Sequence, residues 1–197
     1  MSGPLIRIEG LRVQREGKTI CAVPALEVGA GERLGLVGPN GSGKTTLLKV
    51  LAGLDESANG RLEIDLPVRE RIYVHQQPLL FRGSVLANAT YGLRARGLGR
   101  REAERLAREW LERLGVAHLA SRQREGLSGG EKRRIALAQA LAPAPRLLLL
   151  DEPLADLDDE GAARVLEALA GLEETTLIAA APTALPAGLV DRIHETG

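Results

Sequence analysis

The stretch "GPNGSGKTT", residues 38–46, combines the residue types that bind the phosphates of a nucleotide. It matches the spacing G-x-x-x-x-G-K-[ST] from Gly38 to Thr45. Glycines let the backbone turn its N–H groups inward around phosphate oxygens, at the positive end of the following helix. Lys44 would reach the β- and γ-phosphates, and the Thr45 hydroxyl would ligate Mg²⁺. The predicted phosphate-binding residues are Gly38, Pro39, Asn40, Gly41, Ser42, Gly43, Lys44, Thr45 and Thr46.

The alternative for this stretch is a glycine-rich turn that carries Lys-Thr by chance. The flanking residues disfavour it, because the strand pattern "RLGLV" precedes the loop and "KTTLLKVLAG" follows with helical spacing. A strand, a glycine loop and a helix in that order form the context that a phosphate loop requires. Nucleotide binding is therefore predicted.

Two acids follow the apolar run in "LLLLDEP", residues 147–153. Open α/β sheets bind ligands at the carboxyl ends of their strands, so both acids would face a ligand. Asp151 would hold the Mg²⁺ shell, and Glu152 is suited to act as general base on the attacking water. The alternative is a core strand followed by a solvated acidic turn, which the upstream phosphate loop disfavours.

The segment "LSGGEKRRIALAQALA", residues 127–142, predicts a second phosphate-binding element. Ser128 and Glu131 have the spacing of a capping box at a helix start. Gly129 and Gly130 leave backbone N–H groups bare at that helix end, where an anion can bind. The alternative is a well-capped helix with no ligand.

Strands and helices alternate along the rest of the chain, and this pattern favours a buried parallel sheet covered by helices. "LIRIEGLRVQ" and "TICAVPALEV" predict a strand pair, and Asn59-Gly60 predicts a turn before another strand. Helical spacing dominates residues 79–142, where "RREAERLAREWLERLG" has one apolar face and closes at Gly115. We therefore expect a mainly helical insertion.

Composition narrows the class of protein. The 197 residues carry 26 basic and 26 acidic side chains, a balance that gives no electrostatic argument for a nucleic-acid partner. The single cysteine, Cys21, rules out an internal disulfide framework. No secretory signal and no apolar run of the ~18 residues needed to span a membrane is predicted. Any membrane part would have to come from another polypeptide.

The string "LSGGEKRR", placed before "LLLLDEP", resembles the signature motif of ATP-binding-cassette (ABC) ATPases, and the resemblance runs from about residue 5 to 195. It implies an α/β fold: a P-loop NTPase (RecA-like) core with a mainly parallel sheet, an antiparallel β subdomain and a helical insertion. Residues 1–197 would form a single nucleotide-binding domain. Its ATP-binding core with the antiparallel part would comprise 1–78 and 143–197, and its helical subdomain 79–142.

The resemblance also implies how the site is completed. Two cassettes pair head to tail, so Ser128, Gly129, Gly130 and Glu131 would bind the ATP held by the opposite subunit. Gln76 matches the family's Q-loop glutamine, a contact to Mg²⁺ and water, with Gln77 as the alternative. Asp158 matches the acid at the dimer seam, although an acidic helix cap competes with that interpretation.

The sequence departs from the family pattern at two positions. Ala181 stands where ABC cassettes usually carry a switch histidine at a strand end, and alanine cannot donate or accept a hydrogen bond through its side chain. Arg15 stands where an aromatic residue commonly stacks on adenine. Its guanidinium can stack on a base, but a solvated surface role is equally open, so weak selectivity for ATP over GTP is predicted.

The resemblance implies an ATPase with ATP and Mg²⁺ as cofactors, peripheral on the cytoplasmic, inner face of the cell membrane. Its partners would be a second cassette, transmembrane permease subunits and a solute-binding protein, with no nucleic acid. Residues 76–97 resemble importer cassettes for oxyanions such as tungstate, molybdate or phosphate. The main alternative is a slow or inactive switch cassette beside an active partner. A soluble ABC factor of DNA repair or translation is disfavoured, because residues 46–127 leave no room for a long coiled coil.

Overall fold

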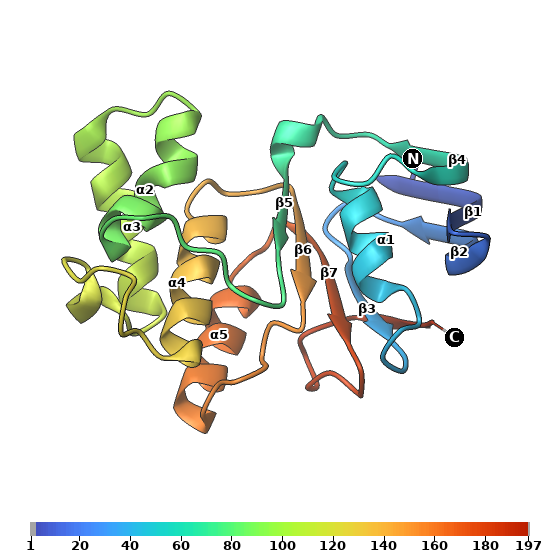
Figure 1. The fold of residues 1–197 in the computed structure, drawn as a ribbon. Helices are drawn as coiled ribbons and strands as arrows, with labels where there is room; N and C mark the ends of the chain where they lie inside the picture. Colours follow the sequence, from blue (N-terminus) through green and yellow to red (C-terminus); the bar gives the residue numbers. More distant parts are fainter. Residues whose placement is uncertain (1–2, 197) are drawn as a thin grey trace. The chain divides into compact units, whose positions relative to one another are not determined.

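The computed structural model describes residues 3–196, which divide into two compact units (Figure 1). The first unit comprises the described residues up to Tyr73, then Arg146–Glu152, and the described residues from Glu173 onward. The second comprises Val74–Pro145 and Pro153–Leu172. The α/β class with a parallel and an antiparallel sheet is confirmed, whereas the single nucleotide-binding domain over residues 1–197 stays a prediction.

An antiparallel sheet of three strands forms one layer of the first unit. In spatial order the strands are β2 (Lys18–Val28), β1 (Ile6–Arg15) and β4 (Ala58–Ile64). The apolar residues of β1 alternate with exposed ones, so Ile6, Ile8 and Val13 point into the core and lie almost fully buried. The predicted strand pair, β1 with β2, is confirmed.

The predicted turn at Asn59-Gly60 is wrong, because both residues lie inside β4. The register of β1 against β4 shifts here, so that Gly10 and Leu11 lie opposite Gly60 as a β-bulge. Gly60 has φ +102°, and a Cβ atom on it would overlap the Gly10 carbonyl. Glycine is therefore required at position 60 because another backbone approaches closely within the sheet. From the sequence alone, an Asn-Gly pair inside a strand looks the same as an Asn-Gly pair in a turn.

A five-stranded sheet carries the predicted phosphate loop. In spatial order its strands are β5 (Arg71–Val74), β6 (Leu147–Asp151), β7 (Thr176–Ala181), β3 (Arg33–Val37) and β8 (Arg192–Glu195). β3 pairs in parallel with β7 and β8, and β6 pairs in parallel with β7. The helix α1 (Lys44–Leu51) contacts β2, β6 and β7, and residues 147–150 are fully buried. The carboxyl ends of β3, β6 and β7 consequently meet at one edge.

Helices make up the second unit. They are α2 (Val85–Ala95), α3 (Arg100–Arg113), α4 (Gly129–Leu141) and α5 (Asp159–Ala170), with the short 3₁₀ turn η2 (Ala117–Leu119); a second such turn, η1 (Val68–Glu70), precedes β5. α2 packs on α3 and α4, and α4 also contacts α5. The predicted apolar face of α3 is confirmed by the buried Ala103, Ala107 and Leu111. Among residues 3–196, no helix is both long and apolar enough to cross a membrane.

We expect Gly60→Ala to lower the free energy of unfolding by about 3 kcal/mol. The left-handed backbone costs about 1–2 kcal/mol for a residue with a Cβ, and relieving the overlap with Gly10 costs about 1–3 kcal/mol more. Gly188→Ala is the matched control, because Gly188 has φ +82° with nothing within 4 Å of its Cβ position. Urea unfolding of both variants measures the difference; equal losses would contradict the bulge argument.

Candidate functional site

The loop between β3 and α1 is shaped by close contacts at two of its glycines. Gly43 stands at the N-cap of α1 with φ +91°, and a Cβ on it would lie 2.5 Å from the Ile20 carbonyl oxygen. A Cβ on Gly38 would overlap the backbone carbonyl of Thr196. Only glycine fits these two positions, so the loop is held in its curved form by the strands around it.

Lys44 lies inside its own loop and is buried. Its ammonium donates to the Gly38 carbonyl oxygen at 2.6 Å, to the Pro39 carbonyl oxygen at 2.9 Å and to Ser42 Oγ at 3.4 Å. A buried ammonium needs such partners, and phosphate oxygens are acceptors of the same kind. The loop thus fits a triphosphate, with the lysine charge already held within it.

The two predicted magnesium ligands of the first unit are brought together. Thr45 Oγ1 donates to Asp151 Oδ2 at 2.8 Å, and Asp151 is only 2% exposed. A hydroxyl and a carboxylate are hard oxygen ligands that suit Mg²⁺. Among residues 3–196 no cluster of three His, Cys, Asp or Glu residues could hold a metal alone. The donor set therefore fits a Mg²⁺ ion that takes its other ligands from phosphate and water.

Tyr73 is a part of this site that sequence reasoning missed. Its hydroxyl donates to Asp151 Oδ2 at 3.0 Å, the same oxygen that Thr45 contacts. Burial, followed by the charge of Asp151, raises the pKa of Tyr73 well above its ordinary value, so the hydroxyl keeps its proton and donates. The only sequence signal was its place on β5, close before the predicted Gln76.

Glu152 is the first residue after β6 and has a left-handed backbone, φ +50°. Its amide donates to the Ala180 carbonyl oxygen at 2.9 Å, so the chain turns sharply while still bound to β7. A residue with a side chain in this conformation costs roughly 1–3 kcal/mol, and such strain is typical of functional sites. The role of Glu152 as general base stays a prediction.

Ala181 ends β7 and pairs in register with Val37, the last residue of β3. The carboxyl end of β7 therefore presents an apolar methyl group beside the start of the phosphate loop. His194 does not replace it, because His194 pairs with Leu36 from β8, on the opposite side of β3. Burial lowers the pKa of His194 and favours its neutral form.

Thr196 is a second residue that the sequence did not reveal. Its Oγ1 lies 2.7 Å from Ser42 Oγ, and its amide donates to the Val37 carbonyl oxygen at 2.8 Å. The residue that follows β8 thus supports the phosphate loop through a contact between residues 154 positions apart. No local pattern signals such a pair.

The predicted capping box at α4 is confirmed. Ser128 Oγ accepts from the Glu131 amide at 3.2 Å, and Glu131 Oε2 accepts from the Ser128 amide at 2.7 Å. The bond from the Ser128 amide holds the pKa of Glu131 below its usual value. Gly129 and Gly130 form the first turn, as predicted. Their contact with ATP of an opposite subunit stays a prediction.

Gln76 and Gln77 are exposed and follow β5, in the second unit. The Gln76 carbonyl oxygen accepts from Arg133 Nη2 at 2.8 Å, and the Gln77 amide donates to His75 Nδ1 at 2.9 Å. The backbone of this segment is therefore held in place while both glutamine side chains stay exposed. The choice of Gln76 as the magnesium and water contact stays a prediction.

Asp158 and Arg15 each have a partner within the chain. Asp158 Oδ1 accepts from the Gly161 amide at 2.9 Å and caps α5, so the competing cap interpretation describes its bond in the single chain. Arg15 Nη2 donates to Asp55 Oδ2 at 2.7 Å, and its side chain is 61% exposed. Stacking of Arg15 on a base and a seam role for Asp158 stay predictions.

Comparisons with known proteins agree with this geometry. Residues 23–155 match the family described as ABC transporter. The tungstate uptake system ATP-binding protein TupC of Peptoclostridium acidaminophilum is 39% identical over 160 residues, covering 79% of this chain and 75% of that protein. The molybdate/tungstate import ATP-binding protein WtpC of Thermococcus kodakarensis is 43% identical over 145 residues, covering 69% of this chain and 44% of that protein.

A solved structure has the same fold. It is cbiO1 of Clostridium perfringens, part of the ABC transporter complex cbiONQ. It superposes with a TM-score of 0.77 at 28% identity, over 92% of this chain and 80% of that chain.

We expect Tyr73→Phe to weaken the Mg²⁺-dependent part of ATP binding about 10-fold, the loss typical of removing a partner that orients a metal-binding carboxylate. ATP binding in EDTA should stay within a factor of 2 of wild type, because Lys44 and the glycine loop are unchanged. Calorimetric titration with and without Mg²⁺ measures both. Tyr91→Phe removes a hydroxyl from the other unit and serves as the control; equal effects of the two variants would contradict the assignment.

Proposed function

The chain belongs to the ABC transporter family, and from this premise we propose that it hydrolyses ATP to drive a membrane transporter. The family and the relatives named as ATP-binding proteins point to an ATP-binding subunit with ATPase activity. The observation that carries the proposal is the meeting of Thr45 with Asp151 next to a glycine loop that encloses Lys44. Lysine, hydroxyl and carboxylate are the groups that phosphoryl transfer requires.

Each side chain has a separate task in the proposed reaction. Lys44 binds and orients the β- and γ-phosphates, and the loop amides add donors around them. Thr45 and Asp151 would hold Mg²⁺, which supplies positive charge to the phosphates when bound. Glu152 accepts the proton of the attacking water. Its left-handed backbone sets the direction in which its side chain leaves the main chain.

We further propose that residues 1–197 act as one nucleotide-binding domain that pairs head to tail with a second cassette. The capped first turn of α4 supports this, because Gly129 and Gly130 present amides at a helix N-terminus where an anion binds well. Lys44 and these glycines would then grip one triphosphate from two subunits. Ser128 keeps the turn formed before any ligand arrives.

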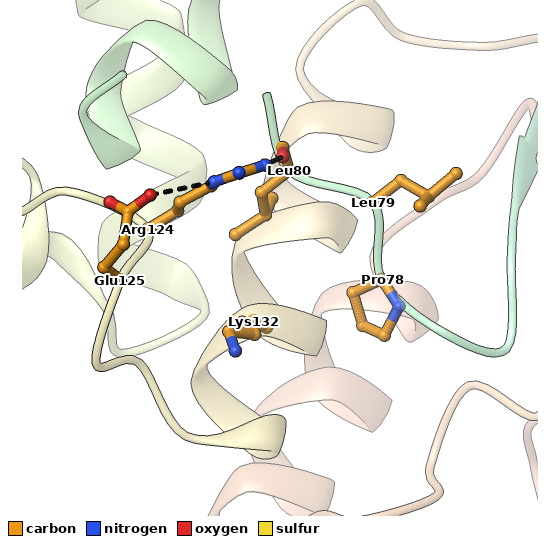
Figure 2. A pocket seen from close by; sticks show the side chains of 6 residues that line it. All are labelled: Pro78, Leu79, Leu80, Arg124, Glu125 and Lys132. Atoms are coloured by element: carbon orange, nitrogen blue, oxygen red, sulfur yellow. Dashed lines mark hydrogen bonds and ion pairs between the residues drawn. The ribbon is translucent and has the colours of Figure 1, made fainter. Parts of the chain in front are cut away.

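The second unit has a surface suited to a permease. Leu79 is 74% exposed, and Phe81 and Tyr91 are exposed with ring centroids 4.5 Å apart. Next to Leu79 lies an open pocket of about 360 Å³ (Figure 2), lined by Pro78, Leu79, Leu80, Arg124, Glu125 and Lys132. Apolar side chains rimmed by charges are typical of protein interaction sites. We propose that permease subunits dock here.

The cargo is proposed from the names of two relatives and from the sequence resemblance of residues 76–97. Both relatives are named for tungstate or molybdate transport, in accord with the resemblance of residues 76–97 to oxyanion importer cassettes. We propose an oxyanion importer with a solute-binding protein in the complex. The chain would lie peripherally on the cytoplasmic face of the membrane.

Ala181 favours a second candidate, a slow or inactive switch cassette that works beside an active partner. The methyl group at the end of β7 offers no hydrogen bond to a γ-phosphate. Loss of one charge-stabilising contact at such a site lowers turnover by roughly 10²–10³. Glu152 at the end of β6 speaks for retained, slow hydrolysis.

We expect Ala181→His to raise kcat by about 10²-fold, because the imidazole restores a donor at the edge shared by β3 and β7. Turnover is measured on purified protein by phosphate release. His194→Ala is the control and should leave kcat unchanged, since His194 lies across β3. A histidine variant no faster than wild type would show that the missing imidazole does not limit the rate.

We expect Glu152→Gln to lower kcat by about 10²–10⁴-fold and to trap a dimer in saturating Mg·ATP, because the general base is lost while binding remains. Analytical ultracentrifugation measures the mass. The same variant with Lys44→Ala serves as the control and should stay monomeric. The proposed function would be wrong if Glu152→Gln stayed monomeric and also failed to pair with any second cassette.

A further inference from the structure

Arg133 is a buried cation in α4 that joins two loops of the second unit. Its side chain is 3% exposed, and Nη2 donates to the Gln76 carbonyl oxygen at 2.8 Å. The same nitrogen forms an ion pair with Asp156 Oδ2 at 3.2 Å. One side chain therefore touches both the segment after β5 and the loop after β6.

Asp156 belongs to the loop that leads from Glu152 into α5, and its position is tightly constrained. Its backbone is left-handed, φ +61°, which is uncommon for a residue with a side chain. A Cβ on Gly130 would lie 3.1 Å from the Asp156 carbonyl oxygen, and one on Gly129 would lie 3.7 Å from Asp156 Cβ. The loop thus packs on the two glycines that begin α4.

The segment that Arg133 contacts leads directly into the pocket proposed for the permease. Arg133 binds the carbonyl oxygen of Gln76, and Arg124 Nη1 binds the carbonyl oxygen of Leu80 at 2.8 Å. Figure 2 shows the Arg124 guanidinium next to Leu80, and both residues line that pocket. Two arginines therefore fix the two ends of segment 76–80, and exposed Leu79 lies between them.

Burial makes the Arg133 contacts dependent on each other. A buried guanidinium is costly unless its charge is paired, so its position follows that of its carboxylate partner. The Asp156 side chain is 73% exposed and is accessible to a ligand or a second subunit, whereas the Arg133 side chain is only 3% exposed. A shift of the Asp156 loop would move Arg133 and, through it, the Gln76 carbonyl.

We propose that Arg133 is a positioning residue. It transmits a change in the position of the Asp156 loop to segment 76–80. This role rests on the proposed function, in which binding of a nucleotide has to be coupled to the permease that docks beside Leu79. The link itself lies wholly within the second unit and exists without nucleotide.

Hydrogen exchange of the full chain, without nucleotide, tests the link. We expect Asp156→Asn to speed amide exchange in a peptide covering residues 74–82 roughly 5- to 10-fold, because the segment loses a fixed anchor. Arg133→Met should reproduce the effect, since it keeps an apolar stem of similar length and removes the Nη2 group that makes both contacts. Asp159→Asn removes the same charge in the first turn of α5, outside the ion pair, and should change nothing.

A second arm uses Glu152→Gln, with or without Asp156→Asn, in saturating Mg·ATP. We expect ATP to change exchange in the 74–82 peptide of the single variant and not of the double variant, while ATP binding stays within about 3-fold. Unchanged apo exchange in Asp156→Asn, or an equal response of both variants to ATP, would overturn the proposal. A Glu152→Gln chain that stays monomeric and pairs with no second cassette, while Asp156→Asn loosens the segment, would overturn the proposed function and leave the link intact.

Discussion

The hydrogen bond from Thr45 to Asp151 is the interaction on which the site depends. It joins residues 106 positions apart, and it forms only because β3 and β6 run in parallel with β7 between them. Parallel strands need their faces covered, and residues 147–150 are buried throughout. The apolar core thus does more than stabilise the fold, because it brings the hydroxyl and the carboxylate to one edge of the sheet.

Backbone strain and crowding surround this edge. Gly38 and Gly43 have no room for a side chain, and Glu152 adopts a left-handed backbone despite having one. Each of these backbone conformations costs free energy, and each persists because contacts with the neighbouring strands stabilise it. Such strain is expected where loops must present amides and carboxylates to a ligand. Gly60, opposite the bulge in β1, shows the same use of glycine at a position with no chemical role.

The helical unit holds its polar groups in a different way, through caps at a helix end and through the buried Arg133. Ser128 and Glu131 satisfy the first turn of α4 locally, and Arg133 on the same helix binds a backbone carbonyl and a carboxylate from two other segments. Local caps fix a helix end, whereas a buried arginine fixes distant loops relative to that helix. Both kinds of contact are present in the chain before any ligand binds.

The sequence by itself determined the phosphate loop, the two acids at the carboxyl end of β6, the capping box and the apolar face of α3, because each depends on residues close together in the chain. It also identified Ala181 at a strand end. Only the tertiary structure decided that Tyr73 shares Asp151, that Thr196 supports Ser42, that Gly60 lies opposite a bulge in β1 and that Arg133 joins two loops. These pairs arise from strand order and helix packing. The period and spacing of residues in one segment do not indicate which distant segment will lie beside it in the fold.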